Sequence, residues 1–203
     1  RVQPRAARPH HLHRRRRAAR HDGQILRFLR QGDAFVVVGS QSQRLERLVA
    51  SGGAVTGWTL HDDAINAAEG YDAAGKLLWI ADRAGNRATL TYSDAATPAS
   101  IAPWPGLLIR VTDAVGRQIS FTYTARGRIA QIVDPAGEAH TYTYHPNENV
   151  QTRTAPGGGL RRYHYESSSF TRLLTGITDE NGARFATWTY DTSGRVVSST
   201  RAD

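Results

Sequence analysis

Apolar and polar residues alternate in short segments along most of the chain. In residues 117–123, for example, Ile119, Phe121 and Tyr123 alternate with polar side chains. A period of two residues places these three side chains on one face of an extended strand. Segments of about six or seven residues have an ordinary length for a strand. The pattern therefore predicts an all-β protein built from short strands.

Tyrosines recur through this pattern at a fixed interval. Tyr71 and Tyr92 are 21 residues apart, and Tyr123, Tyr144 and Tyr165 follow one another at the same interval. Tyr190 closes the series after a longer step, and the copies from Tyr123 onward each have an aromatic partner two positions earlier, namely Phe121, Tyr142, Tyr163 and Trp188. Because residues i and i+2 share one face of a strand, each pair places two rings on the same face. We infer a repeat of about 21 residues, with two strands and two turns.

The sequence Asp-x-x-Gly separates the predicted strands. Six copies lie at residues 72–75, 82–85, 113–116, 134–137, 179–182 and 191–194, with a degenerate copy at 124–127. An Asp side chain can cap the backbone two residues later, and Gly tolerates positive φ at the end of a tight turn. Each copy therefore predicts a hairpin. Because a lone hairpin is only marginally stable, successive units are expected to form a continuous antiparallel, meandering sheet.

The turn and the tyrosine together resemble a known repeat. Residues 71–77 read Tyr-Asp-Ala-Ala-Gly-Lys-Leu and residues 190–196 read Tyr-Asp-Thr-Ser-Gly-Arg-Val. Both are similar to the Tyr-Asp-x-x-Gly-Arg-Leu core of the YD repeat of the RHS family, and the resemblance covers residues 44–203. It implies a segment of a spiralling β-sheet that forms a hollow shell or cocoon. In bacterial members such a shell typically encloses a carboxy-terminal toxin domain delivered by a secretion system, whereas animal relatives use it in adhesion.

Breaks in the repeat divide the chain into three regions. Residues 1–33 are rich in Arg, residues 34–70 are a degenerate β-repeat region, and residues 71–203 carry the YD repeats. A Pro-rich connection at about residues 95–108 interrupts the last region. A further irregular segment is expected at residues 166–174, and a hairpin end at 156–159.

The positive charge of the chain is concentrated at its start. The net charge is +8, from 26 Lys and Arg against 18 Asp and Glu. Residues 1–30 contain ten Arg and one acid, Asp22, so the other 173 residues carry a net charge of −1. We expect residues 1–33 to be disordered or to be translated out of frame. A genuine basic linker and a polyanion-binding arm are the alternatives, and no nucleic-acid partner is expected despite the basic net charge.

The sequence offers little material for catalysis or for a cofactor. It has no Cys, no run of about 18 apolar residues, and none of the phosphate-loop, Gly-x-Ser-x-Gly or His-Glu-x-x-His motifs. His10, His11 and His13 lie among arginines that would repel a metal ion. Several acids could pair for glycoside hydrolysis, but most of them fall at turn positions, as in the set Asp62, Asp63, Asp82 and Asp94. We therefore predict no catalytic, cofactor-binding or metal-binding residue.

The expected function is structural and non-catalytic. The resemblance implies a segment of an RHS repeat shell that encapsulates or delivers a carboxy-terminal toxin domain in a full-length protein that is secreted or displayed at the cell surface. Its partners would be the remaining repeats, the toxin domain and components of a secretion system. The alternative is a carbohydrate- or protein-binding adhesion module that uses exposed aromatic side chains such as Trp58, Trp79, Trp104 and Tyr142. The absence of Met leads us to expect an internal or amino-terminally incomplete piece of a longer protein. The Arg-rich start also lacks the apolar stretch of a secretory signal.

Overall fold

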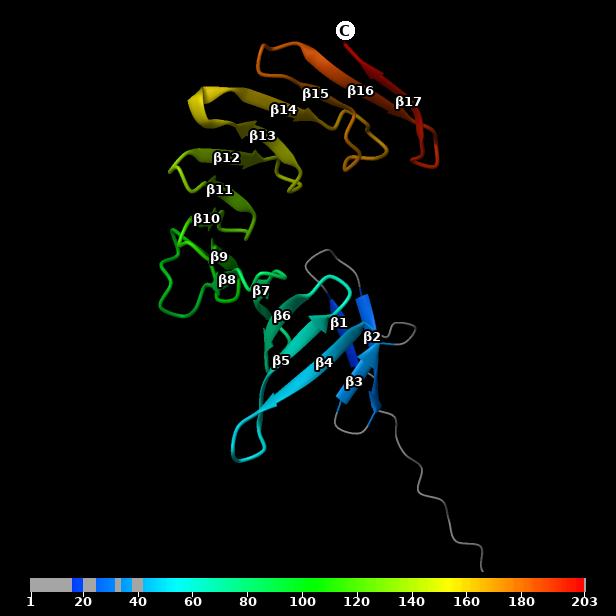
Figure 1. The fold of residues 1–203 in the computed structure, drawn as a ribbon. Helices are drawn as coiled ribbons and strands as arrows, with labels where there is room; N and C mark the ends of the chain where they lie inside the picture. The colour runs from blue at the N-terminus through cyan, green and yellow to red at the C-terminus, as the bar shows by residue number, and fades with distance from the viewer. Residues whose placement is uncertain (1–15, 20–24, 32–33, 38–41, 203) are drawn as a thin grey trace, which may run out of the picture. The chain divides into compact units, whose positions relative to one another are not determined.

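The computed structural model describes residues 16–19, 25–31, 34–37 and 42–202, whose regular secondary structure consists of β-strands joined by turns and loops (Figure 1). One short 3₁₀ turn, Pro156–Gly158, is the one helical element among these residues. The chain divides into two compact units, Arg1–Leu90 (unit 1) and Thr91–Asp203 (unit 2). The border between two kinds of repeat that the sequence suggested at residue 70 stays a prediction. Within the described residues, no helix is long and apolar enough to cross a membrane.

Unit 1 is an antiparallel meander in which each strand pairs with the next one along the chain. Its strands are β1 (Arg16–Ala19), β2 (Ile25–Gln31), β3 (Ala34–Val37), β4 (Gln43–Val49), β5 (Val55–Asp62), β6 (Ala67–Asp72), β7 (Leu77–Ala81) and β8 (Arg87–Tyr92), the last of which ends in unit 2. A buried apolar cluster lies on one face of this meander and contains Phe28, Phe35, Val37, Leu45, Trp58, Leu60 and Tyr71.

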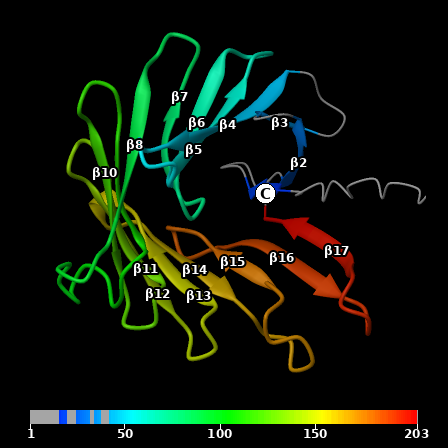
Figure 2. The same cartoon turned by 90° about the horizontal axis from the view of Figure 1, so that it is seen from below.

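Unit 2 is also an antiparallel meander (Figure 2). Its described residues hold no buried apolar cluster comparable to that of unit 1. Its strands are β9 (Leu108–Thr112), β10 (Gln118–Tyr123), β11 (Ile129–Val133), β12 (Ala139–Tyr144), β13 (Val150–Thr154), β14 (Leu160–His164), β15 (Gly176–Thr178), β16 (Arg184–Tyr190) and β17 (Val196–Arg201). Each pairs antiparallel with its neighbours in chain order from β9 to β17. The predicted all-β, antiparallel, meandering fold is confirmed.

The Asp-x-x-Gly segments are tight turns, as the sequence predicted. In the turn at Asp191, the N–H of Gly194 donates to the Asp191 carbonyl at 3.0 Å, and the Asp191 N–H donates to the Arg195 carbonyl at 2.9 Å. The Asp191 carboxylate also accepts hydrogen bonds from the backbone N–H groups of Ser193 and Arg195. Gly194 has a φ of +76°, which an L-residue adopts only at a cost. The Asp and Gly of the repeat therefore act on the backbone of their own turn.

The register of unit 2 gives its sheet two different faces. One face carries hydroxyl side chains directly opposite each other on neighbouring strands: Thr143 opposite Thr152 and Thr189 opposite Ser198. The oxygens of both pairs are 2.6 Å apart. The other face carries the rings of the repeat, including Phe121, Tyr123, Tyr142, Tyr144, Tyr163, Trp188 and Tyr190. We call these the hydroxyl face and the aromatic face.

Residues 1–33 were expected to be disordered or translated out of frame, and parts of this segment form strands where it is described. β1 and β2 lie within it and pair with each other. Arg27 is exposed while its neighbour Phe28 is wholly buried, so the alternation typical of a strand is present inside the Arg-rich stretch. The high Arg content concealed this alternation. Residues 1–15, 20–24 and 32–33, and with them His10, His11 and His13, lie outside the described residues.

Candidate functional site

The four aromatic residues predicted as a binding surface have different environments. Trp58 is 6% exposed, and its ring packs edge-on against Phe35 at 5.7 Å between centroids. The expectation that Trp58 is exposed is therefore wrong, because the side chain belongs to the core of unit 1. Trp79 is half-buried and lies against Gly70, with the Arg87 guanidinium 4.1 Å from its ring centroid.

Trp104 is the exposed member of this set, at 47%. It lies in the predicted Pro-rich connection between β8 and β9, and its backbone is fixed there because the Ser93 hydroxyl donates to the Trp104 carbonyl at 2.9 Å. The ring lies against the turn residue Gly127, where an added Cβ would lie 2.4 Å from the ring. Glycine is therefore favoured at position 127 for two reasons: the backbone has a φ of +73°, and the Trp104 ring leaves no room for a Cβ.

Tyr142 lines an open depression of about 580 Å³ in unit 2. The other walls come from the carboxy-terminal end of β12 and from the turns at residues 124–126 and 145–148. Tyr144 and His145 contribute rings to the lining, and Arg126 and Glu148 contribute charge. A mainly apolar hollow with a few convergent polar groups is the general form of a small-ligand site.

Glu148 has an unusual backbone at this depression. Its φ is +69°, and it occupies the turn position that Gly fills in the Asp-x-x-Gly turns, with its N–H donating to the His145 carbonyl at 2.9 Å. Arg126 Nη1 donates to Glu148 Oε1 at 2.5 Å, and Arg128 Nε donates to Oε2 at 3.3 Å. The hydrogen bond from Arg126, followed by that from Arg128, lowers the pKa of Glu148. A non-glycine residue in this conformation costs energy and is often found at functional sites.

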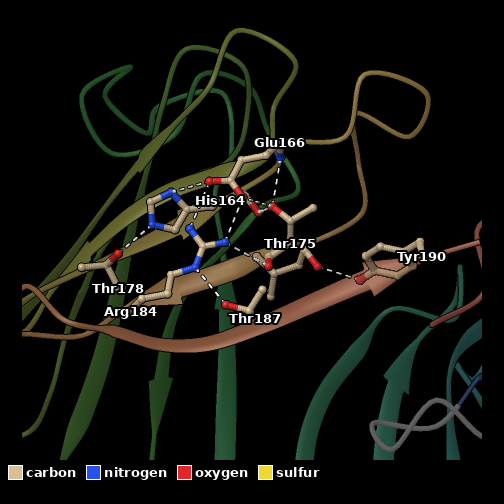
Figure 3. A network of polar contacts seen from close by, with 8 residues as sticks. His164, Glu166, Thr175, Thr178, Arg184, Thr187 and Tyr190 are labelled. Atoms are coloured by element: carbon tan, nitrogen blue, oxygen red, sulfur yellow. Dashed lines mark hydrogen bonds and ion pairs between the residues drawn. The ribbon is translucent and has the colours of Figure 1, made fainter. Parts of the chain in front are cut away.

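A polar cluster of unit 2 surrounds Glu166 (Figure 3). Arg184 donates two hydrogen bonds to its carboxylate, from Nη1 to Oε1 at 3.0 Å and from Nη2 to Oε2 at 2.8 Å. The Thr175 hydroxyl donates to Oε2 at 2.9 Å and accepts from the Glu166 N–H at 3.0 Å. These bonds, chiefly the one from Arg184, lower the pKa of Glu166 to about 2. Arg184 lies directly against Gly176, where any Cβ would collide with the guanidinium.

His164 is the titratable neighbour of this cluster. Its Nε2 lies 2.8 Å from the Thr178 hydroxyl, and its Nδ1 lies 3.9 Å from Glu166 Oε1. Burial, followed by the charge of Arg184, lowers the pKa of His164. Glu166 is held ionised by Arg184, so it is poorly placed to act as a general acid at neutral pH. The cluster closes the irregular segment before β15, which supports a structural role.

The hydroxyl groups of the repeat tyrosines have a role that sequence reasoning missed. Tyr123, Tyr144 and Tyr190 end β10, β12 and β16, and each donates to a backbone carbonyl at or just before the start of the preceding strand. The acceptors are Leu108 at 2.6 Å, Ile129 at 2.7 Å and Leu174 at 2.6 Å. The signal was the 21-residue spacing of the tyrosines, which indicated a repeated role but not its chemistry.

The acids considered for hydrolysis also have structural partners. Asp62 is buried and accepts from Gln43 Nε2 at 2.9 Å, and Arg44 Nε lies 3.6 Å from the Asp63 carboxylate. Asp82 and Asp94 cap their own turns, where side-chain hydrogen bonds from Asn86 and Thr97 respectively lower their pKa values. Among the described residues, no three His, Asp or Glu side chains are grouped so as to hold a metal ion.

The turn geometry and the tyrosine spacing agree with the protein family that the sequence matches. The family described as RHS Repeat matches residues 106–139 and 172–203. The chain carries RHS repeats. Among curated proteins, the RHS-repeat chain is 30% identical over 95 residues to double-stranded DNA deaminase toxin A of Burkholderia cenocepacia (strain H111). The match covers 47% of this chain and 6% of that protein.

Two of the similar solved structures contain Tc toxin components. A crystal structure of TcdB2-TccC3 without the hypervariable C-terminal region has a TM-score of 0.49 and 16% identity, covering 92% of this chain and 12% of that chain. A mutant Tc holotoxin pore of Photorhabdus luminescens has a TM-score of 0.49 and 19% identity, covering 88% and 9%. The RHS-repeat chain thus spans only a small part of each relative.

Proposed function

We propose that the chain is a non-catalytic wall segment of an RHS shell, which encapsulates or delivers a toxin domain in a full-length secreted or cell-surface protein. The observation that supports this most directly is the use of the polar groups of the repeat. The turn aspartates and the repeat tyrosines bond to the backbone of their own hairpins. A wall needs this arrangement because a sheet is closed by pairing its backbone groups. The match to a toxin agrees with the proposed setting.

The test uses the complete gene product with substitutions in this segment. Ala186 is 3% exposed and Val115 is 76% exposed, so Ala186→Asp breaks the wall while Val115→Asp is a matched surface control. We expect the carboxy-terminal domain to resist limited proteolysis in the wild type and in V115D, and to be cleaved rapidly in A186D. A carboxy-terminal domain that is cleaved equally fast in the intact wild type would show that the wall encloses nothing.

The depression beside Tyr142 favours a second candidate function, a carbohydrate- or protein-binding module. Its rings offer a stacking surface, and Arg126 and Glu148 offer donors and acceptors held in place by their mutual ion pair. On a glycan array, Tyr142→Ala is expected to weaken any specific binding at least about tenfold, since truncating a central aromatic contact typically costs that much or more. Tyr163→Ala, on the same face but outside the depression, is the control. Equal binding by both variants would remove this candidate.

A further inference from the structure

The turn between β15 and β16 contains an Asn that is followed by Gly. It reads Asp179-Glu-Asn-Gly182, and no other Asn in the sequence precedes a Gly. The other four, at positions 66, 86, 147 and 149, precede Ala, Arg, Glu and Val. The backbone nitrogen that follows an Asn can attack the carbon of its side-chain amide, and Gly hinders this attack least because it has no Cβ. The sequence of this turn therefore favours a reaction of Asn181 with its own backbone.

The structure leaves the side chain of Asn181 accessible. Asn181 and Gly182 are both exposed, and a Cβ added to Gly182 would meet no atom within 4 Å. Among the described residues, the side-chain amide of Asn181 has no hydrogen-bond partner. By contrast, the side-chain amides of Asn147 and Asn149 both donate to the Thr171 carbonyl, at 3.2 and 2.7 Å. Those two amides are held in place, whereas the Asn181 amide can turn toward the backbone.

The hydrogen bonds of the turn oppose the reaction. The Gly182 N–H donates to the Asp179 carbonyl at 3.1 Å, and the Asp179 carboxylate accepts from the N–H groups of Asn181 and Ala183 at 3.0 and 2.9 Å. The Gly182 nitrogen must leave its bond before it can attack. Hydrogen bonds in an exposed turn open at a free-energy cost far below that of global unfolding. The turn therefore slows the reaction relative to a short peptide of the same sequence without preventing it.

We propose that Asn181 is a site of spontaneous deamidation within the folded protein. The Gly182 nitrogen forms a bond to the Asn181 Cγ, and the side-chain nitrogen leaves as ammonia with the proton from Gly182. The product is a cyclic imide. Water then adds to one carbonyl carbon of the imide, and the bond from that carbon to the Gly182 nitrogen breaks. Opening at Cγ gives aspartate at position 181, and opening at the backbone carbonyl gives isoaspartate, in which the chain continues through Cγ.

Isoaspartate at position 181 changes the main chain of the turn. It adds one methylene group before Gly182, which displaces the Gly182 N–H from the Asp179 carbonyl. β15 has only three residues, Gly176–Thr178, so the hairpin with β16 depends strongly on its turn. Aspartate at position 181 adds a charge but leaves the length of the main chain unchanged. Isoaspartate is therefore the more destabilising product.

The test follows the tryptic peptide of residues 173–184 from the complete gene product, incubated in its folded state at neutral and mildly alkaline pH. Mass spectrometry should show a rise in mass equal to the difference between water and ammonia, in two products that chromatography separates. The rate should rise with pH, because the attacking nitrogen must lose its proton. Peptides that contain the other four Asn should stay unmodified. Each peptide is measured separately because Asp22 precedes Gly23 and can also form an imide.

A synthetic peptide of residues 173–184 supplies the reference rate. Deamidation of Asn181 should be several-fold slower in the folded protein than in the peptide, and it should approach the rate of the peptide when the protein is unfolded in urea. An Asn181 that stays intact in the folded protein, while the peptide and the unfolded chain are converted, would overturn the proposal.

Two variants assign the reaction to the residue and to its turn. Asn181→Gln keeps a side-chain amide but would have to form a larger ring, so the peptide should stay unmodified. Ala136→Asn places an Asn before Gly137, which has a φ of +85°, in a turn where the N–H of residue 136 donates to the Asp134 carboxylate at 2.9 Å. A136N should gain a second site with a rate within several-fold of that at Asn181. No conversion at position 136 would overturn the role assigned to the turn.

The melting temperature separates the effects of the two products. Asn181→Asp supplies the charge without lengthening the main chain, so it should lower the melting temperature less than conversion of the wild type to isoaspartate does. N181Q incubated in the same way controls for other changes during incubation. Equal melting temperatures for N181D and the converted wild type would overturn the assignment of the instability to the lengthened main chain.

Discussion

The two units share one hairpin architecture but are stabilised differently. Unit 1 buries Phe28 and Leu60 almost completely, at 0% and 1% exposure, together with five other large apolar side chains. Across residues 91–202 of unit 2, the buried apolar residues are Ala102 and Ala186 alone. Since a fully buried Leu or Phe contributes about 1.5–3 kcal/mol, the stabilisation from fully buried apolar side chains lies mainly in unit 1.

Unit 2 lacks such a core and is stabilised by hydrogen bonds and ion pairs. Its turns are closed by aspartates, its strand ends by tyrosine hydroxyls, and its irregular segment by the Glu166 and Arg184 ion pair. Such bonds each contribute only about 1 kcal/mol net, so many are needed and none dominates. The comparison teaches that this repeat maintains its shape without a core of its own. It also explains why an aromatic face can stay half-buried and available for contacts.

The largest predicted difference between the units is the loss of stability when a buried apolar side chain is truncated. Leu60→Ala should lower the free energy of unfolding of unit 1 by about 2–5 kcal/mol, because it leaves a cavity in the buried cluster. Urea unfolding followed by fluorescence measures this. Leu78→Ala is the matched control, since Leu78 is 37% exposed and its loss should cost about 0.5 kcal/mol or less. Equal losses in the two variants would contradict the assignment of the core.

A smaller effect is expected at the turn beneath Trp104. Gly116 and Gly127 both have positive φ, at +88° and +73°, but only Gly127 has a side chain against it. Gly116→Ala should cost about 1 kcal/mol through backbone strain. Gly127→Ala should cost at least about 1 kcal/mol more, because the new methyl group displaces the indole ring. Chemical unfolding gives both values, and equal costs would show that the Trp104 contact contributes nothing.

The hydroxyl group of a repeat tyrosine should contribute less to the free energy of unfolding than the glycine at position 127. Tyr144→Phe removes the bond to the Ile129 carbonyl and leaves a carbonyl without its donor, with an expected loss of about 1 kcal/mol. Tyr165 has the same place in the repeat but donates no such bond in the described structure, so Tyr165→Phe should be close to neutral. Thermal unfolding of both variants checks this. A loss in Y165F as large as in Y144F would mean that the hydroxyl bond is not the stabilising element.

The features that could be predicted from sequence are those set within a few residues. The turn at Asp113 needs only Asp113 and Gly116 to form its hydrogen bonds, so its position was visible in the pattern. The strands between such turns followed from alternation. The same reasoning located the Pro-rich connection and the hairpin end at Pro156.

The features that could not be predicted depend on residues far apart in the chain. Trp58 is buried because Phe35 packs against it, and no local pattern indicated that contact. Arg184 reaches Glu166 across an irregular segment, so the pair has no fixed spacing to recognise. Glu148 takes a glycine conformation without being Gly, so its turn was invisible to a search for Asp-x-x-Gly. Partner choice across the sheet therefore needs the three-dimensional structure.

The smallest predicted effect is a dependence of unit 2 on acid. The folded state lowers the pKa of Glu166 from 4.5 to about 2, so the stabilisation is present above pH 4.5 and is lost as the pH falls toward 2. The Glu166 side chain is 57% exposed, so solvent keeps the contribution small. Glu166→Gln should remove part of the decline in melting temperature between pH 4.5 and pH 2, whereas Glu138→Gln, at an exposed turn, should leave the decline unchanged. A decline in melting temperature that is identical in E166Q and the wild type would show that the Glu166–Arg184 ion pair does not stabilise unit 2.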